Sequence, residues 1–355
     1  MSISVDLRSI FNDDFPQIDM LSVICPVYNE EKYISQCIES LLLQDYPKDD
    51  LEILLVDGMS QDKTREIITS YTKKYPFIKM LDNPKQIVPY AMNEGIKASR
   101  GDIIIRLDGH VEYPSNYFSA LVKNLKALDA DNVGALCETL PCGSSAKELA
   151  IAEVLGSSFG MGNSYFRIGC DEIKQVDTVP FGCFKREVFD KVGLYDTELI
   201  RNQDDELNGR IIKNGGKIYL IPSIVTKYYA RDKISKVRKM FYQYGLYKPL
   251  VNKKLGAPAT IRQFFPLAFV LGLILGALAS CIHWVIASIY VMVLAFYLFL
   301  AYWFTVKSMR KTGNWGLLIY QPLTYLTVHV SYGWGYLMGI YKILFHKPFN
   351  AESNR

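Results

Sequence analysis

The chain has 355 residues, of which half are hydrophobic, and its 40 basic and 36 acidic side chains leave a formal net charge of +4. This length allows one sizeable domain and an additional part, whereas so small a charge gives no support for a nucleic-acid partner. The seven cysteines are scattered without a CxxC pair, and the first twenty residues lack the apolar core of a secretory signal. We therefore expect reduced thiols in a cytoplasmic environment.

The first hundred residues alternate apolar strands with amphipathic helices. Four short apolar runs have the length and composition of strands: residues 20–27, 51–56, 78–81 and 103–107. Three intervening segments repeat apolar residues at helical spacing: residues 31–43, 64–75 and 88–99. This alternation predicts a Rossmann-like, doubly wound α/β fold with a mostly parallel sheet. Ligands bind such sheets at the carboxyl ends of the strands, where Tyr28, Asp57 and Asp108 fall.

The motif Asp108-Gly109-His110 follows the fourth predicted strand. An acid and a histidine two positions apart at a strand end can both reach one ion. Mg²⁺ prefers oxygen ligands, while Mn²⁺ also accepts an imidazole nitrogen. The motif is therefore a candidate site for a divalent cation. Alternatively, His110 caps the turn before Pro114 and Asp108 holds the metal alone.

Three consecutive acids, Asp204, Asp205 and Glu206, open a predicted helix. Mutual repulsion raises the pKa of at least one of them toward the range of a general base. The alternative is a negatively charged helix start that the helix dipole favours. The sequence leaves both interpretations open.

Several motifs occur together in the order and spacing of a known enzyme family: residues 25–30, 56–64, 93–95, 101–102, 108–110, 180–186, 193–196 and 201–207. With the apolar segments that follow, residues 20–345 resemble the family 2 glycosyltransferases of GT-A fold. The resemblance extends to the succinoglycan-type membrane-associated glucosyltransferases of exopolysaccharide biosynthesis. The Gln-x-x-Arg-Trp signature of processive synthases is absent, which argues against a cellulose- or hyaluronan-synthase activity.

The resemblance implies a role for each matching residue. It implies a metal-dependent inverting hexosyltransferase in which Asp204 is the catalytic base, the role of neighbouring Asp205 is open, and Mg²⁺ or Mn²⁺ is bound by Asp108 and His110. The residues that would contact the nucleotide-sugar donor, a UDP-sugar by expectation, are Pro26, Val27, Tyr28, Glu30, Asp57, Lys85 and Asp108. The residues that would serve the acceptor are Glu206, Arg210, Arg231 and Gln243. Structural alternatives make Asp57 a helix N-cap, Glu30 a solvated first-turn residue and Lys85 an ordinary surface lysine.

The C-terminal third carries a membrane signal. Residues 263–306 contain no charged side chain, and as a helix this run would be roughly twice the ~30 Å thickness of the hydrocarbon core. It predicts a transmembrane hairpin broken near residues 281–284. Residues 312–341 are a weaker candidate for a third span or a re-entrant segment. Basic residues flank the hairpin on both sides, which places both flanks and the catalytic domain in the cytoplasm.

These features predict a domain order along the chain: an N-terminal extension (1–19), the GT-A domain (20–227), basic and aromatic interfacial helices (228–262), the hairpin (263–306), the third segment (312–341) and a tail (342–355). We expect a multi-pass enzyme of the plasma or inner membrane whose partners are the donor, the membrane and a lipid-linked, polyprenyl-type saccharide acceptor.

Two other classes of function remain to be compared with this expectation. One is a non-catalytic nucleotide-sugar-binding scaffold or sensor, encouraged only by Gln203, where the family more often has Glu, and by His110. The other is an NAD-dependent oxidoreductase, which is disfavoured because no GxGxxG follows the first strand.

Overall fold

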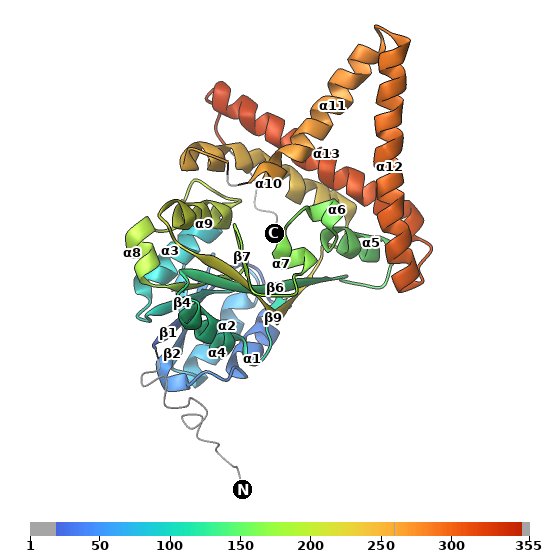
Figure 1. Cartoon of the computed structure of the whole chain (residues 1–355). Coiled ribbons are helices and arrows are strands. Elements are labelled where there is room, and N and C mark those ends of the chain that lie inside the picture. Colours follow the sequence, from blue (N-terminus) through green and yellow to red (C-terminus); the bar gives the residue numbers. More distant parts are fainter. Residues whose placement is uncertain (1–18, 259, 350–355) are drawn as a thin grey trace.

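The computed structural model describes residues 19–258 and 260–349. A mixed nine-stranded sheet forms its centre, and a group of long C-terminal helices lies against one side of the sheet domain (Figure 1). The strands follow the order β3-β2-β1-β4-β8-β6-β9-β5, and β7 pairs with β9 outside this path.

The N-terminal half of the sheet is parallel, as predicted. Its strands are β1 (Leu21–Val27), β2 (Leu51–Asp57), β3 (Ile78–Asp82) and β4 (Ile103–Arg106). They are connected by α1 (Ile34–Leu42), the short 3₁₀ helix η2 (Lys48–Asp50), α2 (Thr64–Lys74) and α3 (Val88–Ala98). Every residue of β1 and β2 is buried, since helices cover both faces of a parallel sheet. Each predicted strand and helix of this half is confirmed.

The second half of the sheet is mixed, so the sheet is mostly but not entirely parallel. Its strands are β5 (Val111–Glu112), β6 (Asn132–Leu140), β7 (Lys174–Gln175), β8 (Cys183–Lys185) and β9 (Ile218–Tyr229). β8 runs antiparallel to both β4 and β6, while β9 is parallel to β6 and antiparallel to β5. The short strand β8 therefore reverses the direction of pairing at the middle of the sheet.

Two layers of helices enclose the sheet. Helices α1, α2 and α4 (Tyr117–Ala127) pack on one face, and α3, α8 (Glu187–Val192) and α9 (Gln203–Lys213) pack on the other. The segment between β6 and β7 forms α5 (Ala146–Leu155), α6 (Ser158–Met161) and α7 (Tyr165–Ile168). α5 and α6 pack against the C-terminal helices, whereas Tyr165 and Phe166 of α7 pack against the sheet domain.

The C-terminal part consists of α10 (Ile234–Leu255), the 3₁₀ turn η3 (Ile261–Phe264), α11 (Phe265–Ser280), α12 (Trp284–Thr312) and α13 (Leu317–Leu344). α11 and α12 project from the body as a hairpin, with α10 and α13 at its base (Figure 1). Its turn coincides with the predicted break. Among the described residues, Ile261–Ser280 and Trp284–Thr312 are long and apolar enough to cross a membrane. α13 falls outside that class, and its role as a third span stays a prediction.

The predicted boundary at residue 228 falls inside a strand. β9 continues to Tyr229, and from Ile224 onward its residues alternate between buried and exposed positions. Such alternation is typical of a strand with one solvated face. Tyr228 and Tyr229 therefore belong to the sheet and not to an interfacial helix. The aromatic and basic composition of this stretch concealed the two-residue period in the sequence.

Small residues let α10 and α13 cross in backbone contact. A Cβ atom at Gly335 would overlap the carbonyl oxygen of Tyr242, and one at Gly339 would overlap that of Leu246. On the facing helix, Gly245 meets the carbonyl oxygen of Tyr332 in the same way. Small residues spaced four apart permit this close approach between helices.

We expect Gly335→Ala to destabilise the protein by about 1–3 kcal/mol, because the added methyl group must push the two helices apart. The matched control is Gly272→Ala on α11, where an added Cβ meets nothing within 4 Å. That control should be neutral or slightly stabilising, since alanine favours helix over glycine. Thermal unfolding of the detergent-solubilised variants measures both. Equal midpoints for the two variants would contradict the close-contact interpretation.

Candidate functional site

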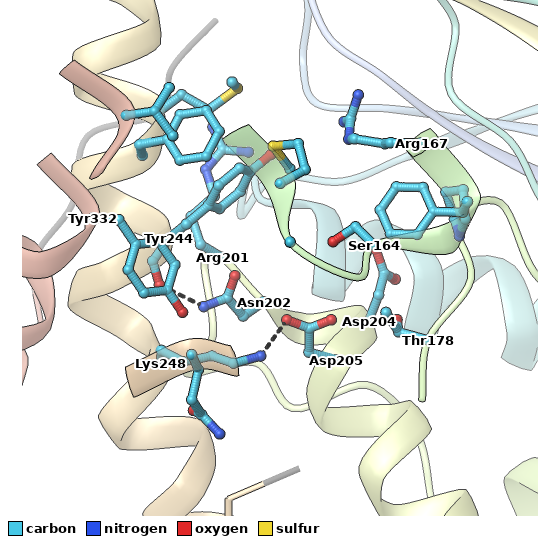
Figure 2. Close-up of a pocket in the computed structure, with 18 of the residues that line it drawn as sticks. Ser164, Arg167, Thr178, Arg201, Asn202, Asp204, Asp205, Tyr244, Lys248 and Tyr332 are labelled. Carbon is cyan, nitrogen blue, oxygen red and sulfur yellow. Dashed lines mark hydrogen bonds and ion pairs between the residues drawn. The ribbon is translucent and has the colours of Figure 1, made fainter. Parts of the chain in front are cut away.

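A cavity of about 660 Å³ lies between the carboxyl edge of the sheet and the C-terminal helices, and we call it the central cavity. The sheet side contributes Asp108 and His110 from the loop after β4, and the start of α9 contributes Asp204 and Asp205. Its far wall comes from α10, α11, α12 and α13. Figure 2 shows Asp204 and Asp205 beside Lys248 and Tyr332 of that wall. The cavity therefore joins the predicted catalytic acids to the membrane-type helices.

The loop that carries Asp108 packs against the loop that follows β1. A Cβ at Gly109 would lie 3.5 Å from Cγ1 of Val27 and 4.0 Å from Cγ of Glu30. The Nδ1 atom of His110 lies 3.6 Å from Oε1 of Glu30, and the ring also packs 6.3 Å from the ring of Tyr228. Four of the predicted residues are thus brought together, and His110 contacts Glu30 and Tyr228 instead of capping the next turn.

Arg106 lies between Asp108, the predicted metal ligand, and Asp204, the predicted base. It is the last residue of β4 and is almost fully buried. Its guanidinium donates a hydrogen bond to the carboxylate of Asp204 and reaches Oδ1 of Asp108 at 3.4 Å. Arg106 at the end of β4 therefore connects Asp108, the predicted metal ligand, with Asp204, the predicted base.

The environment of Asp204 raises the pKa of its carboxyl group. Burial is the largest cause, and the charges of Asp108 and Asp205 act in the same direction, while Arg106 opposes them. A third of the side chain still faces the cavity. A partly desolvated carboxylate that remains accessible is suited to accept a proton from a bound hydroxyl group.

Asp205 is held differently although it is the next residue. Burial alone would raise the pKa of its carboxyl group, but the ammonium group of Lys248 lies 2.7 Å from Oδ2 and brings the pKa below its usual value. Figure 2 shows this pair bridging α9 and α10. Asp205 therefore stays ionised and fastens the site to the C-terminal helices.

Glu206 and Arg210 do not line the central cavity. Arg210 donates to both carboxylate oxygens of Glu206, at 2.7 and 2.9 Å, and to the carbonyl oxygens of Val192, Gly193 and Leu194. Glu206 is buried. The pair ties α9 to the end of α8, and a role of either residue toward the acceptor stays a prediction.

Apart from Asp108, the residues predicted to hold the nucleotide lie outside the lining of the cavity. Pro26 and Val27 are buried in β1, and the ring of Tyr28 covers Gly58. Asp57 is fully buried, accepts hydrogen bonds from Ser60 and pairs with Arg65 at 2.5 Å. It does not cap α2, whose N-cap is Lys63.

Lys85 does not join this group. Its side chain is exposed and lies outside the cavity lining, to which the next residue, Gln86, contributes. The interpretation as a surface lysine fits this position, and a contact between Lys85 and the donor stays a prediction.

Comparison with known proteins identifies the family of this chain. The model of the family described as "Glycosyl transferase family 2" matches residues 22–193. Over 333 residues, 92% of this chain and 98% of the relative, the chain is 31% identical to the dolichyl N-acetyl-alpha-D-glucosaminyl phosphate 3-beta-D-2,3-diacetamido-2,3-dideoxy-beta-D-glucuronosyltransferase of Methanococcus voltae. The chain belongs to glycosyltransferase family 2.

Two further comparisons agree with this assignment. The glycosyltransferase is 31% identical to succinoglycan biosynthesis protein ExoA of Rhizobium meliloti over 264 residues. This alignment covers 74% of this chain and 78% of the relative. A mannosyltransferase from Pyrobaculum calidifontis, solved with GDP-Man and Mn²⁺, superposes with a TM-score of 0.59 at 17% identity over 90% of this chain and 88% of that chain. This likeness confirms the GT-A fold.

Three cavity residues of this glycosyltransferase were not singled out from the sequence: Arg106, Arg167 and Lys248. A charged residue inside the apolar run of β4 is the signal that could have identified Arg106, since buried arginines are rare without a partner. Arg167 lies in a four-residue helix that has no periodic pattern. Lys248 was assigned to an interfacial helix, because the sequence does not show that the folded chain brings it next to Asp205.

The two remaining predicted acceptor residues lie on the C-terminal side of the cavity. Arg231 lines the cavity directly. Gln243 is buried in α10 and accepts a hydrogen bond of 3.1 Å from Arg201, which is itself a lining residue. Gln243 is thus placed to orient Arg201 rather than to touch a ligand.

Proposed function

We propose that this glycosyltransferase moves a sugar from a nucleoside-diphosphate sugar, by expectation a UDP-sugar, to a saccharide carried on a polyprenyl lipid. The observation that carries the proposal is the central cavity, which runs from Asp108 and Asp204 to apolar side chains of α11, α12 and α13. A soluble acceptor would not need that apolar wall. The name of the relative from Methanococcus voltae specifies a dolichyl-linked acceptor, which supports the same class here.

The donor set of the loop after β4 fits a divalent cation. Asp108 offers carboxylate oxygens and His110 offers an imidazole, a combination that suits Mn²⁺ and, through Asp108, Mg²⁺. Glu30 faces the Nδ1 side of His110, and a carboxylate in that position commonly orients a histidine ligand. No group of three His, Cys, Asp or Glu side chains in the described ranges could hold an ion, so oxygens of the donor diphosphate would complete the shell. A bound cation supplies charge neutralisation for the departing diphosphate.

The residues around the cation site deprotonate the acceptor and hold the catalytic groups in position. Asp204 accepts the proton of the attacking sugar hydroxyl, and the transfer is one displacement with inversion at the anomeric carbon. Arg106 holds Asp204 and Asp108 at a fixed separation. The Asp205–Lys248 ion pair joins α9 to α10. It thereby fixes the position of the base relative to the helices that face the acceptor.

The hairpin supports membrane attachment. Its large apolar side chains, among them Leu275, Ile289 and Trp303, are exposed, and an exposed apolar surface of this kind is typical of a membrane or protein interaction site. Lys and Arg lie before α11 and at the end of α12, and this distribution supports a multi-pass protein with its catalytic domain in the cytoplasm.

The transfer rate should fall toward low pH, because Asp204 accepts a proton only when it is ionised. Burial raises the pKa of Asp204, so the loss begins at a higher pH than the usual aspartate value of about 3.9 implies. Arg106 opposes this shift, and Arg106→Met should therefore move the acid limb further to higher pH. The pH dependence of kcat/KM for the acceptor measures the limb. An unchanged or acid-shifted limb would show that Arg106 does not act on the base.

The proposal is tested by radiolabelled transfer from a panel of UDP- and GDP-sugars into the lipid extract of membranes that contain the protein. We expect label in the organic phase with at least one donor, and its loss when divalent cations are chelated. If every donor binds and none is transferred, the protein is instead a nucleotide-sugar-binding scaffold or sensor.

A further inference from the structure

Several basic side chains line the central cavity, and three of them are neutralised by neighbouring acids. Arg106 pairs with Asp204 and Asp108, and Lys248 pairs with Asp205. Arg262 pairs with Asp177 at 2.6 Å. These charges are satisfied within the protein and need no ligand.

Arg167 and Arg231 differ from that group. Both line the cavity, and neither forms an ion pair with a carboxylate within residues 19–258 and 260–349. Arg167 donates a hydrogen bond of 3.2 Å to Oγ1 of Thr139, and its guanidinium carbon lies 4.9 Å from the centre of the Tyr228 ring. Both side chains are half-buried, and a guanidinium that faces a cavity without a carboxylate partner is available to an anionic ligand.

The rest of the cavity lining indicates what kind of ligand the two arginines meet. Arg167 projects from α7 (Figure 2), and Arg231 lies between the end of β9 and the start of α10. The same cavity is lined by Asp204 and by apolar and aromatic side chains of the hairpin and α13, including Phe269, Tyr297 and Val328. One cavity therefore offers an acid, two cations and an apolar wall.

A lipid-linked saccharide carries a group to match each of these three, since its sugar is joined to the lipid through phosphate. We infer that Arg167 and Arg231 bind the phosphate of the acceptor, with its sugar directed to Asp204 and its polyprenyl chain along the apolar wall toward α11 and α12. This inference rests on the proposed function and adds the phosphate site to it. Arginine is suited to the task because its planar group donates two hydrogen bonds to phosphate oxygens.

The donor diphosphate is the other phosphate that these arginines could meet, because Tyr228 contacts both Arg167 and His110. The two sources are separated by measuring them independently. The full-length protein in nanodiscs is titrated with dolichyl monophosphate, with dolichol as the phosphate-free probe, and separately with UDP and GDP in the presence of Mn²⁺.

We expect wild-type protein to bind dolichyl monophosphate at least about tenfold more tightly than dolichol, since charge-assisted hydrogen bonds to a phosphate are stronger than neutral ones. Arg167→Gln and Arg231→Gln should each reduce that preference severalfold, and the double variant should abolish it. Arg167→Lys and Arg231→Lys should retain part of it. Arg238→Gln, at an exposed position of α10 outside the cavity, is the matched control and should keep the full preference.

Nucleotide binding decides the remaining outcomes. Unchanged UDP or GDP affinity in the glutamine variants shows that they are folded and that the arginines serve the acceptor. Equal binding of dolichol and dolichyl monophosphate by wild-type protein would overturn the inference, as would a loss of nucleotide affinity in place of lipid-phosphate preference. A phosphate preference in a protein that transfers no sugar would instead contradict the proposed function and leave the phosphate site standing.

Discussion

Replacement of Asp204 by Asn should lower kcat for sugar transfer by about 10²–10⁴-fold, the range that a general base contributes. Asparagine has nearly the same shape but cannot accept the proton of the acceptor hydroxyl. Because Asp204 belongs to α9 and not to the loops near Asp57 or Asp108, the affinity for the nucleotide sugar should remain close to that of the wild type. Single-turnover transfer with saturating donor measures the first quantity, and equilibrium binding of the donor measures the second.

Asp205→Asn is the matched control, since it removes a carboxylate from the adjacent position of the same helix. Asp205 is already neutralised by Lys248, so its loss should disturb the junction of α9 and α10 and reduce the rate by much less. A full rate for Asp204→Asn, or a larger loss for Asp205→Asn, would remove Asp204 from the role of base.

Asp108→Asn should weaken divalent-cation-dependent donor binding by at least about tenfold, the factor commonly lost even when a residue that only orients a metal ligand is changed. The physical reason is that the neutral amide no longer balances the charge of the cation. Donor binding measured with Mn²⁺ and with chelator gives the cation-dependent part directly. Equal cation dependence in wild type and Asp108→Asn would contradict this assignment.

His110→Ala resolves what Asp108→Asn leaves open. If the imidazole is a ligand, the cation-dependent part of donor binding falls as it does for Asp108→Asn, and the loss is larger with Mn²⁺ than with Mg²⁺. If His110 only packs between Glu30 and Tyr228, donor binding changes little and Asp108 alone holds the cation.

The parallel half of the fold could be predicted because its signals are local. Apolar runs and helical spacing are properties of ten or so neighbouring residues, and β1 to β4 with their helices follow them closely. The turn of the hairpin was predictable for the same reason. The direction of β8 was not, because three residues carry no information about which strands they join, and the pairing with β4 and β6 is a long-range choice.

The site shows the same division between local motifs and long-range partners. Sequence motifs predicted that Glu30, Asp108, His110 and Asp204 gather at the strand ends, and these side chains do lie around one edge of the sheet. A motif could not show which charged side chains form ion pairs with one another. Glu206 and Arg210 satisfy each other four residues apart on α9, whereas Asp205 is paired with a lysine 43 positions away.

The most direct test of a single displacement at Asp204 is the anomeric configuration of the transferred sugar, determined by NMR on the isolated product and compared with that of the donor. One displacement assisted by a base predicts complete inversion. A product that retains the configuration of the donor would require a second displacement, and Asp204 would then not be the base of a one-step transfer.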